Sequence, residues 1–196
     1  MIHFIGFYNY TVILTYLRLC SAVFGMVQAS KENFTIAIFC LMLCGICDAF
    51  DGTVARSKKD RTEDEKSFGI QLDSLCDSIS FGVFPAFLCY YMGADSLFGI
   101  LCICLYTLCA VIRLAFFNVM VMKRQQAESS SNKVYRGLPV TAIAVIFPVI
   151  YLLRFILPGT YFVGILHIML LFVAFLFILD FKVKKPDIEK IISFHK

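Results

Sequence analysis

The chain has 196 residues, of which 60% are hydrophobic and only 16% are charged. Soluble domains average about 45–50% apolar and about 25% charged residues, so this composition excludes an ordinary soluble domain and predicts an integral membrane protein. The formal net charge is +4. Membrane orientation and attraction to anionic lipid headgroups account for that charge, so no nucleic-acid partner is expected.

Six apolar segments follow one another along the chain and predict six transmembrane helices. A spanning helix needs about 20 mostly apolar residues. Because lipid forms no hydrogen bonds with backbone N–H and C=O groups, each segment must pair these groups internally, as an α-helix does. Neither an internal repeat nor a second domain is visible. We therefore expect a single all-α domain over 1–196, a polytopic membrane helix bundle, with spans at 10–29, 33–56, 68–93, 96–122, 137–156 and 161–182.

The distribution of basic residues predicts how the helices are oriented. Thirteen Lys and Arg side chains fall in the polar loop after the second segment, the polar loop after the fourth segment and the tail after residue 181. The short connections on the other side carry only Lys31 and Arg154. Because cytoplasmic loops are rich in Lys and Arg, we expect both termini and both polar loops in the cytoplasm. The chain shows no organelle-targeting features, which is typical of a plasma-membrane protein.

Four aspartates stand inside the second and third segments, where a charged side chain costs about 2.5–3.5 kcal/mol at mid-helix. Asp48 and Asp51 are three residues apart, and Asp73 and Asp77 are four apart, so each pair shares one helix face. A polar loop of about eleven residues joins the two segments, which predicts antiparallel neighbours with both acidic faces at one depth. Four converging carboxylates suit hard cations, Mg²⁺ or Mn²⁺, and a two-metal site of this kind clamps a diphosphate.

Small residues stand beside the aspartates at helical spacing. Gly52, Ala55 and Gly69 would open room for a ligand against the helices. Arg56 lies one turn beyond Asp51 and could hold phosphate oxygens. For glycine and alanine alone, the alternative is ordinary close packing of membrane helices.

The run from Asp48 to Asp77 resembles the signature of the CDP-alcohol phosphotransferases, D-x-x-D-G-x-x-A-R followed by G-x-x-x-D-x-x-x-D. All eight fixed positions are present within 30 residues. The spacer between Arg56 and Gly69 has twelve residues and is longer than is usual in the family. Because the additional residues are charged, they lengthen the loop without disturbing either acidic face.

The resemblance implies an enzyme that cleaves the pyrophosphate of a CDP-linked donor, releases CMP and joins the substituted phosphoryl group to an acceptor alcohol. It implies two divalent cations and, from the family alone, a homodimer. It also implies roles for the matching residues: metal binding by Asp48, Asp51, Asp73 and Asp77, action as the general base by Asp77, and contact with the nucleotide and its diphosphate by Gly52, Ala55, Arg56 and Gly69.

Three further stretches resemble the phosphatidylserine synthase branch of the family: 71–86, 113–118 and 136–141. In the second stretch, Phe116 replaces an arginine that is usual in that branch. The branch implies CDP-diacylglycerol as the donor, with its tails in the bilayer, and L-serine as the acceptor. The candidate acceptor contacts are Arg113, Asn118 and Arg136. Arg113 lies within the fourth segment and needs a partner, either a substrate carboxylate or an aspartate of the chain.

Two alternatives stay open. The same chemistry could use another acceptor, glycerol-3-phosphate or an inositol phosphate, since the chain offers cations for a phosphorylated acceptor at Arg18, Arg113, Lys133 and Arg136. A divalent-cation transporter could use the four aspartates for transit. A transporter has no use for the Gly52, Ala55 and Arg56 pattern, however, and it would normally show internal repeats.

Overall fold

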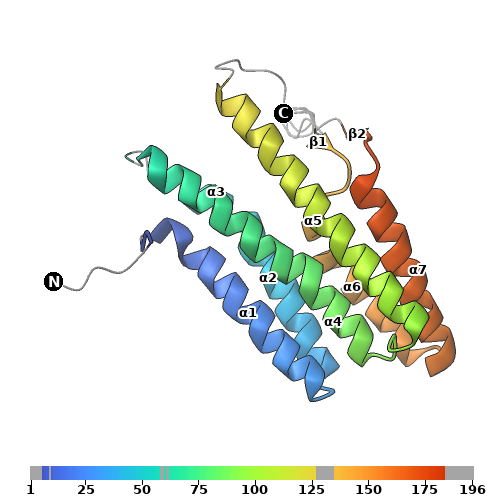
Figure 1. The fold of residues 1–196 in the computed structure, drawn as a ribbon. Coiled ribbons are helices and arrows are strands. Elements are labelled where there is room, and N and C mark those ends of the chain that lie inside the picture. The colour runs from blue at the N-terminus through green and yellow to red at the C-terminus, as the bar shows by residue number, and fades with distance from the viewer. Residues whose placement is uncertain (1–5, 9, 58–59, 61, 127–134, 184–196) are drawn as a thin grey trace, which may run out of the picture.

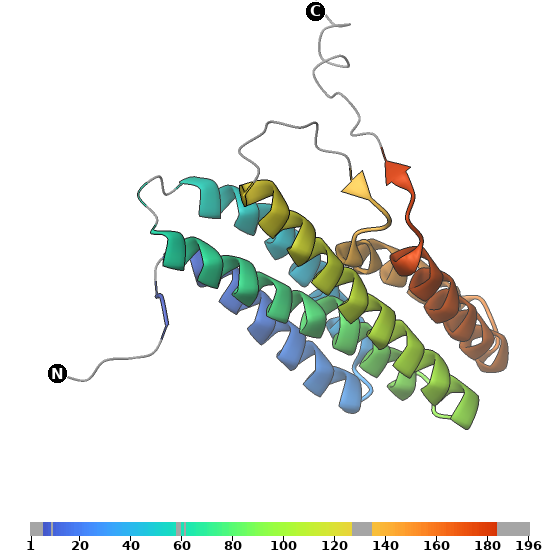
Figure 2. The same ribbon diagram turned by 45° about the horizontal axis from the view of Figure 1, so that its top comes forward.

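The computed structural model describes residues 6–8, 10–57, 60, 62–126 and 135–183, which form one bundle of long helices (Figures 1 and 2). A 3-10 turn, Tyr10–Val12, leads into the first helix. The helices are α1 (Ile13–Ser30), α2 (Phe34–Ser57), α3 (Glu63–Asp77), α4 (Phe84–Tyr91), α5 (Leu97–Gln126), α6 (Ile143–Leu152) and α7 (Gly159–Ile178). A π-helical segment, Ser78–Val83, joins α3 to α4.

Five stretches of helix are long and apolar enough to cross a membrane: Ile13–Ser30, Phe34–Val54, Glu63–Tyr91, Leu97–Met122 and Gly159–Ile178. The polytopic all-α bundle expected from the sequence is therefore confirmed. The expected sixth span, 137–156, is represented by a shorter apolar stretch, Val140–Phe155. Only α6 within it is α-helical, and 3-10 turns flank α6 on both sides. The count of six full-length spans stays a prediction.

The third span begins earlier than the expected residue 68, because a capping box starts α3 at Glu63. The Thr62 hydroxyl accepts a hydrogen bond from the Glu65 backbone N–H at 3.2 Å, and the Glu65 carboxylate accepts one from the Thr62 N–H at 3.2 Å. Lys66 also pairs with Glu63 at 2.7 Å on the same helix. The loop between α2 and α3 is therefore shorter than the eleven residues expected from its charged sequence.

A two-residue antiparallel pair, which the sequence did not predict, joins β1 (Tyr135–Arg136) to β2 (Lys182–Val183). Gly137 follows β1 with φ of 69°, a left-handed conformation that favours glycine. Its N–H donates to the Phe181 carbonyl at 2.7 Å. These contacts fasten the segment before α6 to the end of α7.

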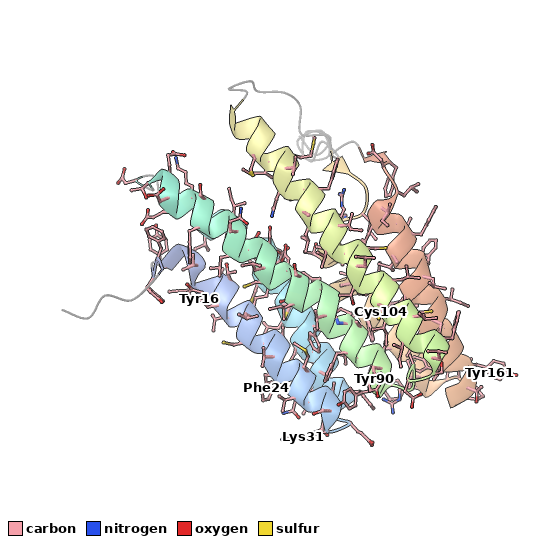
Figure 3. All side chains as sticks on the ribbon, in the orientation of Figure 1. Tyr16, Phe24, Lys31, Tyr90, Cys104 and Tyr161 are labelled. Carbon is pink, nitrogen blue, oxygen red and sulfur yellow. The ribbon has the colours of Figure 1, made fainter. Side chains whose placement is uncertain are left out.

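The buried face of α1 carries Thr15, Arg18, Ala22, Gly25 and Ala29 at alternating spacings of three and four. The small residues among them allow close approach of the neighbouring helices. At Gly25 the approach is closest, because a Cβ atom there would lie 2.3 Å from the Phe84 ring of α4. The outer face of α1 carries Phe24, which is largely exposed (Figure 3).

One end of the bundle collects the elements that flank the polar loops. The start of α1, the start of α3, the end of α5 and the β1–β2 pair lie there (Figures 1 and 2). Lys31 and Tyr161 lie at the other end (Figure 3). This separation agrees with the grouping of loops that the charge distribution predicts.

The π-helical segment follows Asp77 directly and has an identifiable cause. Pro85 has no N–H, so it cannot donate the hydrogen bond that the Phe81 carbonyl would accept in a regular α-helix. Tyr106 of α5, which is fully buried, donates its hydroxyl to that carbonyl instead, at 2.5 Å. The side chain of α5 thus replaces a missing backbone donor and holds α5 against the helix that carries Asp77.

We expect Tyr106→Phe to lower the free energy of unfolding by about 1–3 kcal/mol, because it leaves a buried carbonyl without a donor. Thermal or denaturant unfolding in detergent measures the effect. Tyr161→Phe is the matched control, since Tyr161 is exposed at the far end of the bundle (Figure 3). Equal stability of the two variants would contradict the assignment.

Candidate metal centre and active site

The two acidic faces predicted from the sequence meet at one point of the bundle. Asp48 and Asp51 come from α2, and Asp73 and Asp77 come from α3. Carboxylate oxygens of Asp48, Asp73 and Asp77 all lie within 4.8 Å of one another. The structure therefore brings together the side chains that the helical spacings align, and α1 supplies the residue that lies between them.

That residue is Arg18, whose side chain is fully buried. Its Nη1 atom is 2.9 Å from Asp77 Oδ1 and 3.2 Å from Asp51 Oδ2, and it also pairs with Asp48. Its Nη2 atom is 2.6 Å from Asp73 Oδ1 and donates to the Asp73 backbone carbonyl at 3.2 Å. A single guanidinium contacts all four carboxylates and joins α1 to both acidic helices.

The cluster has an excess of negative charge when its carboxylates are ionised. Four ionised carboxylates against one guanidinium leave a net charge of −3 among these five groups. In a site of low dielectric constant, such an excess is unfavourable unless further positive charge is present. The cluster therefore favours additional cations.

The donor set fits a hard divalent cation. All four acidic side chains offer oxygen ligands of the kind that Mg²⁺ and Mn²⁺ prefer. Oδ2 of Asp51 and Oδ1 of Asp77 are buried and accept no hydrogen bond from the described part of the chain, although both lie within ion-pair distance of Arg18 Nη1. A cation that displaces the guanidinium would find both oxygens as ligands. The side chain of Asp73 is 43% exposed, against 11% for Asp51 and Asp77, so the cluster opens on the Asp73 side.

The small residues of the motif lie where the sequence places them on the helices. Gly52 follows Asp51 on α2, and Gly69 precedes Asp73 by four residues on α3; both are half-buried. Ala55 and Arg56 belong to the last turns of α2, and their side chains lie outside the described part of the structure. Their expected contacts with the nucleotide and diphosphate stay predictions.

The three candidate acceptor residues have different surroundings. The Ser74 hydroxyl, between Asp73 and Asp77 on α3, donates to Oδ1 of Asn118 at 2.7 Å, so Asn118 of α5 lies beside the acidic helix. Arg136 is in β1, and its side chain is outside the described residues.

Arg113 lies on the part of α5 that faces the end of α7. It lines a cavity of about 220 Å³ together with Phe116, Leu179 and Asp180. A Cβ atom at Gly137 would lie 3.3 Å from its guanidinium carbon. The ion pairs of the four motif aspartates in the described part of the chain are made with Arg18, and the acidic neighbour of Arg113 is Asp180.

An apolar groove of about 670 Å³ runs between α2 and the segment that contains α6, and Asp48 lies on its wall. The two helices come close at Gly45, where a Cβ atom would lie 2.7 Å from the Ala144 Cβ. Ile46 and Val145, which also line the groove, are largely exposed on the outside of the bundle. The groove therefore connects the apolar surface of the bundle to the acidic cluster.

Sequence reasoning considered Arg18 only as a possible cation for a phosphorylated acceptor and missed its place between the aspartates. The signal was present, because an arginine in the middle of an apolar span is expensive and requires acidic partners. The aspartates are the available partners in neighbouring spans, although the sequence alone did not show that α1 packs beside them.

Comparison with known proteins agrees with the motif. The family model described as CDP-alcohol phosphatidyltransferase matches residues 8–179. The chain is 33% identical over 127 residues to the CDP-diacylglycerol–serine O-phosphatidyltransferase of Saccharomyces cerevisiae, which is 63% of this chain and 45% of that protein. It is 33% identical over 144 residues to the archaetidylserine synthase of Methanothermobacter thermautotrophicus, which is 73% of this chain and 58% of that protein.

A third relative, a CDP-diacylglycerol–serine O-phosphatidyltransferase of Helicobacter pylori, is 34% identical over 120 residues, which is 60% of this chain and 46% of that protein. The chain spans about half the length of the curated relatives it matches. Because the family model covers nearly the whole bundle, including α1, the acidic motif and α7, the chain belongs to the CDP-alcohol phosphatidyltransferase family.

Proposed function

We propose that the chain transfers the phosphatidyl group of CDP-diacylglycerol to the hydroxyl of L-serine, giving phosphatidylserine and CMP. The observation that carries the proposal is the convergence of four motif aspartates on Arg18, beside an apolar groove that Asp48 lines. The serine-transferring relatives named above support the choice of donor and acceptor.

In the proposed reaction, the serine hydroxyl oxygen attacks the phosphorus that carries the diacylglycerol, and the bond from that phosphorus to the bridging oxygen of the diphosphate breaks. CMP leaves with the bond's electron pair. Asp77 accepts the hydroxyl proton, and its buried position keeps that proton away from bulk water. Asp48, Asp51, Asp73 and Asp77 would hold two Mg²⁺ or Mn²⁺ ions, which neutralise the charge of the diphosphate when bound.

The groove supports a lipid donor. Most of the residues that line it are apolar, and Asp48 on its wall marks where a diphosphate headgroup would meet the cluster. An acyl chain in the groove would gain about 0.8 kcal/mol for each buried methylene group relative to water. The bilayer offers it similar surroundings, so the groove would mainly orient the donor.

The surroundings of α5 support a zwitterionic acceptor. Arg113 and Asp180 place opposite charges on one small cavity, and Asn118 lies beside the acidic helix. A carboxylate and an ammonium group complement this arrangement better than the doubly charged phosphate of glycerol-3-phosphate or an inositol phosphate does. We therefore assign acceptor contacts to Arg113, Asn118 and Arg136, and contacts with the cytidine diphosphate part to Gly52, Ala55, Arg56 and Gly69.

The basic loops also support a location and an orientation in the membrane. The chain would act in the plasma membrane, with the end of the bundle that carries β1 and β2 in the cytoplasm, where L-serine and CMP are soluble. Support comes from the basic loops, which flank elements at that end, whereas the far end carries Lys31 (Figures 1 and 3). A homodimer, expected from the family alone, is part of the proposal.

The full chain, purified in detergent, should release CMP from CDP-diacylglycerol only when L-serine and Mn²⁺ or Mg²⁺ are both present, and EDTA should abolish the release. Parallel reactions with glycerol-3-phosphate and an inositol phosphate identify the acceptor. Release with one of these and none with serine would keep the chemistry and overturn the acceptor. No release with any acceptor would favour a divalent-cation transporter.

Asp77→Asn should lower turnover at least about 100-fold, since general-base catalysis typically contributes that much. It should largely spare metal-dependent binding of the CDP donor. Asp64→Asn is the matched control, because Asp64 is an exposed aspartate in the first turn of the same helix. Near-normal turnover in the Asp77 variant would exclude this residue as the base.

Ala49→Phe places a large side chain on the wall of the groove and should select against long acyl chains. We expect the ratio of kcat/KM for a long-chain donor to that for a dioctanoyl donor to fall by roughly tenfold, because a long chain pushed out of the groove no longer orients its diphosphate toward the cluster. Val23→Phe adds comparable bulk to the outer face of α1, away from the groove, and should leave the ratio unchanged. A ratio that does not change in Ala49→Phe would show that acyl chains lie elsewhere.

A further inference from the structure

Arg18 makes contacts that a metal ion would also need. Nη1 contacts Asp48, Asp51 and Asp77, and Nη2 contacts Asp73, so one guanidinium uses all four acidic side chains. A divalent cation binds carboxylate oxygens at about 2.0–2.6 Å, closer than a hydrogen-bonded nitrogen. An ion held between Asp48 and Asp77 would therefore lie close to the position of Nη1, and the two cations compete for the same oxygens.

The surroundings of Arg18 hold it beside the acidic cluster. Its side chain is fully buried, and the Cys44 thiol of α2 donates to the Arg18 backbone carbonyl at 3.4 Å. The guanidinium also lies near the Phe81 ring, with its central carbon 5.9 Å from the ring centroid. When the carboxylates are taken by metal ions, the guanidinium stays beside the cluster because its backbone is held by α2.

One donor of Arg18 is unused. Nε is buried and has no hydrogen-bond partner in the described part of the chain. A buried charged donor without an acceptor is unfavourable, and phosphate oxygens are good acceptors for a guanidinium. A diphosphate at the cluster would supply the acceptors that the arginine lacks once its carboxylate contacts are released.

We propose that Arg18 is the internal counterion of the metal-free site, that it releases its carboxylate contacts when divalent cations bind, and that it then binds the diphosphate of the CDP donor. The inference rests on the proposed metal site. Two divalent cations would turn the net charge of −3 into +1, and this remaining positive charge is that of Arg18. Without Arg18, the loaded site would be neutral and would attract an anionic diphosphate less strongly.

The proposal predicts effects of opposite sign on two ligands. Removal of Arg18 takes away a competitor of the metal ions, so metal binding should become tighter. It also takes away a positive contact of the diphosphate, so donor binding should become weaker. A residue that only stabilises the bundle would weaken both when it is removed.

The test is titration of the detergent-purified full chain with Mn²⁺, followed by titration with CDP at saturating Mn²⁺, both by calorimetry. In Arg18→Gln, we expect the Kd for Mn²⁺ to fall about tenfold and the Kd for CDP to rise about tenfold, since one unit charge is removed close to both ligands. Arg154→Gln is the matched control. Arg154 also lies against an aromatic ring, with its guanidinium carbon 4.5 Å from the Phe34 centroid, and its side chain is exposed.

Unchanged or weaker Mn²⁺ binding in folded Arg18→Gln would overturn the proposal, and so would unchanged CDP binding. If the glutamine variant does not fold, Arg18→Lys serves instead, because lysine keeps the charge but has one nitrogen in place of the two, Nη1 and Nη2, that contact the aspartates. Its Kd for Mn²⁺ should lie below that of the wild type, and an equal or higher value would contradict the competition. Absence of Mn²⁺ binding by the wild-type chain would overturn the metal site itself, an outcome distinct from failure of Arg18 alone.

Discussion

The contact between one buried guanidinium and four carboxylates is the constraint on which the rest of the bundle depends. Four like charges placed at one point between apolar helices would repel one another and push α2 and α3 apart. Arg18 reduces that repulsion and ties three helices together. The cluster still carries more negative than positive charge, so the same interaction that stabilises the bundle leaves the site suited to further cations.

Helix packing next to the acidic cluster holds the aspartate-bearing helices in place. Gly25, on the same face of α1 as Arg18, allows the Phe84 ring to approach, and that contact holds α1 against α4. Pro85 removes a backbone donor next to that ring, and Tyr106 supplies a replacement from α5. The helix that carries Asp77 is thus held from two sides, by α1 and by α5, just beyond the acidic residues. A metal site needs such support, because the surrounding packing must keep the carboxylates in position when cations and substrates bind.

Sequence reasoning predicted the parts of the site that depend on local periodicity. The spacings of Asp48 with Asp51 and of Asp73 with Asp77 give helix faces directly, and their convergence follows from a short connection between two spans. The early start of α3 was also readable, because Thr62 and Glu65 form the pattern of a capping box, but the surrounding charges made the segment resemble a loop. The place of Arg18 was not readable, since it depends on which helix packs between α2 and α3.

The two routes to the cluster differ in polarity, and that difference suits a reaction between a lipid and a water-soluble alcohol. On one side, the groove brings apolar surface up to Asp48. On another, Asp73 is the most exposed of the four carboxylates, while Asp51 and Asp77 are nearly covered. A donor anchored in the bilayer and an acceptor arriving from water could therefore reach the same carboxylates without crossing each other's path. Asp77, among the most buried of the four carboxylates, is the one in which a transferred proton is best protected from water.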